Sequence, residues 1–159
     1  MSPQYRHIVV SGVRVAYIER EASGRQYETS ILLLDALLAT AETLAELIAG
    51  LSTDRRVVAL DLLSASSSDK KSVDVHQASL TGLIHEFMQT IGLVQPVLIG
   101  HSHGGALALR LAATAPMALK GLVLLAPAHP FGGYRSRVVN FYLRQPGRML
   151  ALSIPVAPS

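Results

Sequence analysis

Two runs rich in β-branched residues open the chain on either side of a short turn. The first run covers residues 7–10, the second covers residues 13–18, and Ser11-Gly12 lies between them. A two-residue connection that contains glycine, set between two such runs, is typical of a β-hairpin. We therefore expect an antiparallel pair of strands at the start of the chain, followed by a polar, turn-like stretch from Arg20 to Ser30.

Four short apolar runs follow, each with the length and composition of a strand. They cover residues 31–34, 56–61, 97–99 and 120–125. A strand that is covered on both faces reads as a nearly continuous apolar run, whereas a half-exposed strand alternates between apolar and polar residues. The four runs therefore predict buried strands of a parallel sheet.

Segments with helical spacing separate these runs. Residues 40–51 predict a helix with Thr40 as its N-cap, residues 73–91 predict a longer helix ended by Gly92, and residues 103–113 predict a third. Strands that alternate with helices favour βαβ units. We predict an α/β fold with a mostly parallel sheet flanked by helices and the antiparallel N-terminal hairpin at one edge. The apolar positions that repeat at helical spacing in the first two helices are Leu44, Leu47, Ile48, Leu51, Leu80, Leu83, Ile84, Phe87 and Ile91.

The composition is that of one globular domain. Half of the 159 residues are hydrophobic and 16% are charged, so there is enough apolar material for a buried core. The absence of cysteine excludes disulfides and thiolate metal sites. No apolar run approaches the roughly 18 residues of a membrane span, and the first residues do not resemble a secretory signal. We expect a cytoplasmic protein without a membrane span.

The charges are distributed unevenly along the chain. The net charge of +3 combines −3 over residues 1–102 with +6 over residues 103–159, where no acidic residue occurs. The later basic residues are spread thinly and lack interleaved aromatic residues, so we predict no nucleic-acid binding. A membrane-surface role for residues 131–150 is a weaker alternative, because Gly and Pro interrupt any continuous amphipathic helix there.

Residues 100–104 carry the chemistry. They read Gly-His-Ser-His-Gly, with Gly105 directly after them, and they join a predicted strand to a predicted helix. This is the strand–turn–helix setting of a serine nucleophile elbow, in which Ser102 is the candidate nucleophile and the backbone N–H of His103 is a candidate oxyanion donor. In the alternative interpretation the glycines serve only close packing, and Ser102 is an incidental N-cap.

The order of these elements, with Leu-Ile-Gly-His-Ser-His-Gly-Gly over residues 98–105 and Leu-Val-Leu-Leu-Ala-Pro over residues 122–127, resembles the α/β-hydrolase superfamily. The resemblance covers nearly all of residues 7–130. It is greatest to single-domain bacterial serine hydrolases related to esterases and to carbon–carbon bond hydrolases. A serine at the elbow is unlike the aspartate of haloalkane dehalogenases and epoxide hydrolases.

The resemblance implies a domain organisation and a site. Residues 1–130 would form the amino-terminal part of the hydrolase core, and residues 131–159 the start of a truncated helical cap or lid. Ser102 would attack a small-molecule ester or a related acyl or carbon–carbon bond. The backbone N–H of Leu37 would complete the oxyanion hole with that of His103. The family needs no metal and no organic cofactor, so we expect none.

Two departures from the family concern loops. Family members usually carry His-Gly after the strand at residues 31–34, whereas this chain has Asp35-Ala36. A carboxylate at residue 35 would place negative charge near a developing oxyanion, which opposes its stabilisation. The loop after Asp61 also lacks the usual Pro-Gly-x-Gly turn, which indicates a looser surface turn.

The third departure concerns the catalytic triad, which runs Ser, acid, His in this fold. No Asp or Glu follows Ser102, and the later histidines are His103, which is part of the elbow, and His129, which follows the last predicted strand. Without a base, a serine hydroxyl is a poor nucleophile at neutral pH.

Two hypotheses about function therefore stay open. In the first, the chain is part of a serine hydrolase that is catalytically incomplete by itself, and a complementing carboxy-terminal half supplies the acid and the histidine. In the second, it is a non-catalytic, truncated hydrolase that acts as a binding or interaction module. The second hypothesis predicts self-association, because an unfinished sheet exposes a strand edge and apolar surface.

Overall fold

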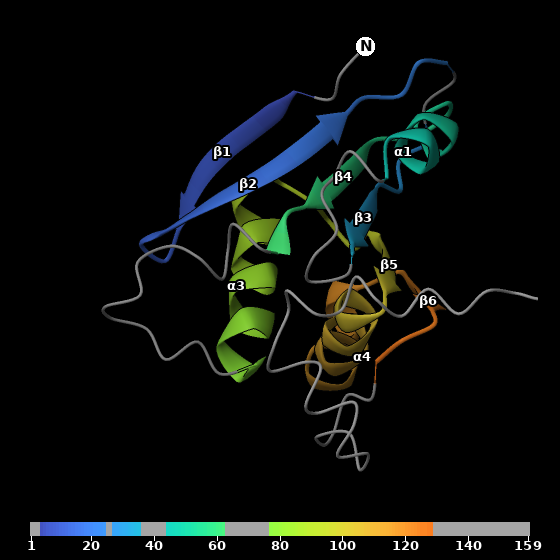
Figure 1. The fold of residues 1–159 in the computed structure, drawn as a ribbon. Helices are drawn as coiled ribbons and strands as arrows, with labels where there is room; N and C mark the ends of the chain where they lie inside the picture. Colours follow the sequence, from blue (N-terminus) through green and yellow to red (C-terminus); the bar gives the residue numbers. More distant parts are fainter. Residues whose placement is uncertain (1–3, 25–26, 36–43, 63–76, 129–159) are drawn as a thin grey trace, which may run out of the picture.

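A computed structural model of the chain describes residues 4–24, 27–35, 44–62 and 77–128 (Figure 1). Within these ranges the strands form one six-stranded sheet in the order β1-β2-β4-β3-β5-β6. The pairs β1–β2 and β2–β4 are antiparallel, and the other pairs are parallel. The predicted α/β fold with an antiparallel hairpin at one edge is therefore confirmed. The strands are β1 (Tyr5–Val10), β2 (Val13–Arg20), β3 (Ile31–Leu34), β4 (Val57–Leu60), β5 (Val97–His101) and β6 (Gly121–Leu125).

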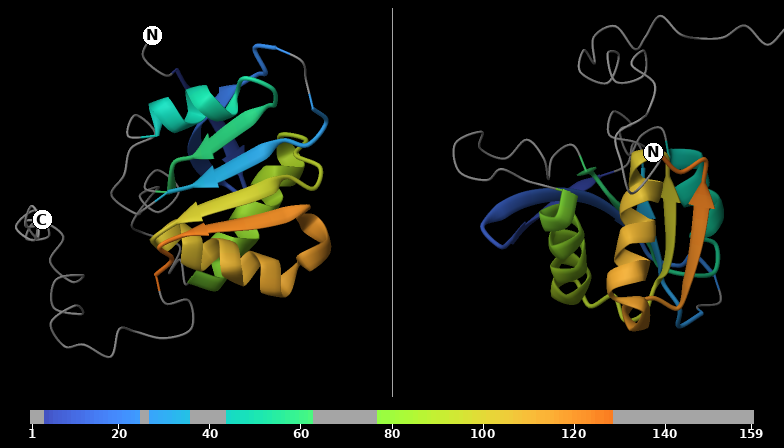
Figure 2. Two further views of the ribbon diagram at one scale, coloured as in Figure 1. Left: turned by 90° about the vertical axis from the view of Figure 1, so that its right-hand side faces the viewer. Right: turned by 90° about the horizontal axis from the view of Figure 1, so that it is seen from below.

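The helices lie on both sides of this sheet. They are α1 (Ala45–Leu51), α3 (Gln77–Thr90) and α4 (His103–Thr114), with a short 3-10 helix, η1, over Pro116–Ala118. Figure 2 shows α3 and α4 on one face of the sheet and α1 on the other. Helix α1 begins at Ala45 with Leu44 in the N-cap position, whereas the prediction began this helix at Thr40. Thr40 itself lies outside the described residues.

The hydrophobic core is divided between the two faces. Successive residues of a strand point to opposite faces, and in β3 this sends Leu32 and Leu34 into the cluster built with α3 and α4. Leu33 of the same strand belongs to the other cluster, which contains Ile48 of α1. Among the described residues, the face covered by α1 has the shorter helix, since α1 has seven residues.

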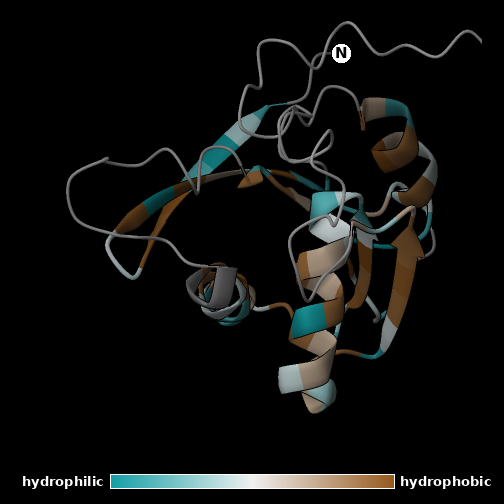
Figure 3. Cartoon of the chain, turned by 60° about the horizontal axis from the view of Figure 1, so that its bottom comes forward, coloured by the Kyte–Doolittle hydropathy of each residue, from teal (hydrophilic) through white to brown (hydrophobic). Residues whose placement is uncertain are grey.

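The prediction that the run at residues 120–125 is a fully buried strand is wrong. β6 is the last strand of the described sheet, and Val123 and Leu125 are 41% and 42% exposed. In Figure 3 β6 is almost wholly hydrophobic in colour. Helix α4 contacts β6 from one face, and no described helix covers the α1 face at this strand. Apolar composition therefore overestimated the burial of an edge strand.

In the described part of the chain, no helix has both the length and the apolar character needed to cross a membrane.

Candidate active site

Ser102 lies between the last residue of β5 and the first residue of α4. Its backbone has φ 51° and ψ −114°, a conformation that non-glycine residues rarely adopt and that costs about 1–3 kcal/mol. The Ser102 hydroxyl makes no capping hydrogen bond to α4. Ser102 thus occupies the N-cap position of α4 without using its side chain as a cap, and the alternative interpretation, in which the glycines serve only close packing, stays open.

Glycines around Ser102 permit contacts that no side chain would allow. A Cβ atom on Gly100 would lie 2.7 Å from the carbonyl oxygen of Gly104, and one on Gly105 would lie 2.9 Å from the Cβ atom of Pro127. A Cβ atom on Gly104 would lie only 2.2 Å from the carbonyl oxygen of Leu34. The strand, the turn and the helix thus approach each other with backbone against backbone.

Backbone hydrogen bonds attach Ser102 to β6 and the residues after it. The N–H of Ser102 donates to the carbonyl oxygen of Leu125 at 3.0 Å, and the N–H of Ala128 donates to the carbonyl oxygen of Ser102 at 2.8 Å. The same carbonyl oxygen accepts from the N–H of Ala106 in α4 at 3.2 Å. Ser102 is therefore held from three sides, as a strained residue must be if its conformation is to persist.

The backbone N–H of His103 occupies the first position of α4. The first N–H groups of a helix have no intrahelical acceptor, and the positive end of the helix dipole adds to their attraction for an anion. The role of this N–H group as an oxyanion donor stays a prediction. Leu37 and His129 lie outside the described residues, so the roles considered for them stay predictions.

The His103 side chain is partly buried beside the elbow. Burial lowers the pKa of its imidazole below 6.5, and the positive charge of Arg110 lowers this pKa further. The ring is therefore held in its neutral form near pH 7.

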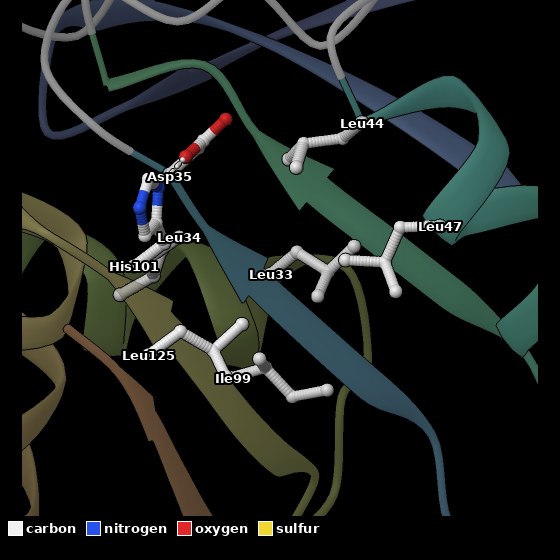
Figure 4. A pocket seen from close by; sticks show the side chains of 8 residues that line it. All are labelled: Leu33, Leu34, Asp35, Leu44, Leu47, Ile99, His101 and Leu125. Carbon is white, nitrogen blue, oxygen red and sulfur yellow. Dashed lines mark hydrogen bonds and ion pairs between the residues drawn. The ribbon is translucent and has the colours of Figure 1, made fainter. Parts of the chain in front are cut away.

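Asp35 and His101 form a pair that the sequence patterns did not predict. The Asp35 carboxyl is buried, and its Oδ1 lies 2.7 Å from Nδ1 of His101 (Figure 4). When the carboxyl is ionised it only accepts hydrogen bonds, and the facing Nδ1 of His101 is then the donor. The parallel register pairs Leu34 with Gly100, and the next residue of each strand brings these two side chains together. The expectation that Asp35 places negative charge near a developing oxyanion stays a prediction, and the structure adds that its carboxyl has a histidine partner.

This pair closes one end of an apolar groove on the α1 face of the sheet. The groove has a volume of about 200 Å³ and lies beside the carboxyl ends of β3 and β5 (Figure 4). Leu47 of α1 contributes to it and is 39% exposed. The groove is lined by Leu33, Leu34, Asp35, Leu44, Leu47, Ile99, His101 and Leu125.

Among the described residues, no group of three or more His, Asp or Glu side chains is arranged to hold a metal ion. We therefore assign no metal ligands there, and the expectation that the protein needs no cofactor stays a prediction.

Comparisons with known proteins identify the class that this fold and elbow define. A family model for the alpha/beta hydrolase fold matches residues 29–154, which is most of the chain. The chain belongs to the α/β-hydrolase family, as the sequence resemblance implied.

Individual relatives agree with this assignment. The chain is 30% identical over 129 residues to the dihydrolipoyllysine-residue acetyltransferase component of the acetoin cleaving system of Cupriavidus necator, covering 77% of this chain and 32% of that protein. It is 29% identical over 145 residues to the uncharacterized hydrolase YugF of Bacillus subtilis, covering 87% of this chain and 52% of that protein.

A solved structure shows the same fold. The chain superposes on a probable hydrolytic enzyme from Pseudomonas aeruginosa with a TM-score of 0.65 and 26% identity, covering 78% of this chain and 41% of that one. The chain thus spans about a third to a half of the length of the relatives that it matches.

Proposed function

We propose that Ser102 is the nucleophile of a serine hydrolase that cleaves a small-molecule ester or a related acyl or carbon–carbon bond. The observation that carries this proposal is the strained backbone of Ser102, whose hydroxyl is not used to cap α4. Folded proteins retain such strain mainly where function requires a side chain in that position.

The chemistry follows from the groups around the elbow. In the reaction on an ester, the Ser102 oxygen bonds to the acyl carbon while a base accepts its proton, and the carbonyl oxygen becomes an oxyanion. The N–H of His103 donates to this oxyanion, and the N–H of Leu37 would be the second donor. Collapse of the intermediate expels the alkoxide, which takes up the proton, and water then releases the acid from the serine. One such donor is worth about 10²–10³ in rate.

The acid that follows serine in this family would come from outside these 159 residues, because no Asp or Glu follows Ser102, and we propose the same origin for the base in place of His103 or His129. A complementing carboxy-terminal half is the partner that this proposal requires. The isolated chain should then bind and position an acyl group without turning it over. Residues 131–159 are the proposed start of a cap over the site. A cytoplasmic location is a prediction from the sequence.

Release of nitrophenolate from a short-chain nitrophenyl ester tests this part of the proposal. We expect the isolated chain to show no turnover above that of Ser102→Ala. Turnover by the isolated chain that disappears in Ser102→Ala would place an effective base within these residues, and the complementing half would then be unnecessary.

A second candidate is a non-catalytic module that acts through its surface. The observation that favours it is the exposed apolar side of β6 at Val123 and Leu125, next to the groove. Such a surface promotes association with another chain. Size-exclusion chromatography with light scattering tests this candidate, which predicts self-association. A monodisperse monomer that melts cooperatively would contradict it.

A further inference from the structure

We propose that Asp35 and His101 are a positioning pair that holds the elbow in its reactive conformation. This inference rests on the proposed function of Ser102. It assigns to both residues a role in setting the reactivity of the serine, rather than a direct part in the chemistry.

The pair extends the connection between β3 and β5 beyond the end of their backbone ladder. The register between these strands ends at Leu34 and Gly100. The contact of 2.7 Å between the Asp35 carboxyl and His101 Nδ1 lies one residue further along, directly before Ser102. A side-chain contact thus continues the pairing of β3 with β5 after their backbone hydrogen bonds end. It holds His101, the residue directly before the proposed nucleophile.

The elbow is restrained on its two sides in different ways. On the β6 side, backbone hydrogen bonds join Ser102 to Leu125 and Ala128. On the β3 side, the residue before Ser102 is joined to Asp35 through side chains. The carbonyl oxygens of Leu34 and Asp35 also lie against Gly104, where a Cβ atom would be 2.2 and 2.7 Å from them. Asp35 therefore contacts the elbow both before and after the nucleophile.

The burial of Asp35 explains why this contact is specific. Its side chain is only 9% exposed, and a buried carboxylate is costly unless it is hydrogen-bonded or paired. The carboxylate therefore holds the imidazole in one orientation.

Positioning and simple stability can be separated by comparing single and double substitutions. The Asp35 carboxyl is buried and the His101 side chain is 47% exposed, so removing His101 deprives a buried carboxyl of this partner, whereas replacing both residues by leucine removes the carboxyl as well. The double variant Asp35→Leu/His101→Leu suits this site, because the neighbouring groove is already lined by leucines. If the pair serves only the stability of the fold, the double leucine variant should label like the wild type. If the pair positions Ser102, the double variant should label slowly.

The experiment measures the rate at which a fluorophosphonate labels the purified full chain over a range of probe concentrations. This gives a limiting rate and a half-saturating concentration for each variant. We expect His101→Gln and the double leucine variant to lower the limiting rate about 10- to 100-fold, with little change in the half-saturating concentration, as for a misplaced reacting group. Asp54→Asn, which changes the partly exposed ion pair with Arg55, and His7→Gln, on an exposed position of β1, are matched controls that we expect to label like the wild type.

Asp35→Asn and Asp35→Ala provide a second comparison that does not depend on the double variant. Asparagine retains an oxygen that accepts from Nδ1 of His101, so we expect Asp35→Asn to label near the wild-type rate and Asp35→Ala to label slowly. A double leucine variant that labels at the wild-type rate, or equal rates for Asp35→Asn and Asp35→Ala, would overturn the positioning role alone. A wild-type chain that is not labelled at Ser102 would overturn the proposed function, and this inference with it.

Discussion

The α-carbon of Gly104 lies so close to β3 that a Cβ atom there would be 2.2 Å from the carbonyl oxygen of Leu34. No side-chain rotation can relieve this contact, because the obstructing atom belongs to the backbone. Helix α4 and strand β3 can therefore approach each other only with glycine at residue 104.

We predict that Gly104→Ala destabilises the fold by about 1–3 kcal/mol or more, as overpacking does, and displaces the elbow. Gly82→Ala is the matched control, because a Cβ atom on this glycine of α3 meets no atom within 4 Å. Alanine is favoured over glycine inside a helix by about 0.5–1 kcal/mol, so the control should be unchanged or more stable. Chemical denaturation measures both variants. Equal stabilities of the two would contradict the close approach.

Strain at Ser102 predicts that glycine at this position gives a more stable fold than alanine does. Ser102→Gly relieves the positive φ of 51°, whereas Ser102→Ala keeps a Cβ atom and therefore the strain. We expect Ser102→Gly to be more stable than Ser102→Ala by about 1 kcal/mol, the lower end of the cost of such a conformation. Both variants lose the hydroxyl, so neither should be labelled. Thermal melting compares them, and a less stable Ser102→Gly would argue against strain at this residue.

The partly buried His103 predicts a dependence of stability on pH. Burial lowers the pKa of its imidazole in the folded chain below 6.5, so the unfolded chain binds the proton more readily. Its contribution to stability is therefore fully present above about pH 6.5 and decreases as the pH falls through that value toward the folded pKa. We expect His103→Gln to lose less stability than the wild type between about pH 7.5 and pH 5. Equal losses would show that His103 does not contribute, and His7→Gln, on an exposed residue of β1, is the control.

The exposed side of β6 predicts association between chains. Val123 is 41% exposed, and a lysine there would place a charge on an apolar edge strand, as natural edge strands often do. We expect Val123→Lys to shift any self-association toward monomer in light scattering. Met117→Lys, on η1 and at a residue that is 80% exposed, should leave the association unchanged. An equal effect of the two would indicate a general effect of charge rather than an interface at β6.

Local patterns in the sequence were sufficient to predict the strand–turn–helix setting of Ser102. Its glycines, the apolar run before Ser102 and the helical run after it are contiguous, so the strand–turn–helix setting could be derived without knowing the rest of the fold. The hairpin was predicted for the same reason, since Val10 and Val13 flank the turn in the sequence and pair in the sheet. Features of this kind depend on neighbours along the chain.

The pairing of Asp35 with His101 could not be derived in this way. It depends on β3 lying beside β5, although β4 comes between them in the sequence. The exposure of Leu125 was missed because apolar composition does not reveal whether another element covers a strand. The start of α1 was placed too early because Thr40 is a good capping residue by type alone.

The measurement that tests the central claim most directly is the site at which a fluorophosphonate labels the purified chain, read by intact mass and then by peptide mapping. We predict a single adduct on Ser102, formed slowly in the absence of a complementing half but faster than on any other serine, and absent from Ser102→Ala. An adduct spread over several serines, or none in a folded sample, would contradict the claim that Ser102 is the nucleophile of a hydrolase.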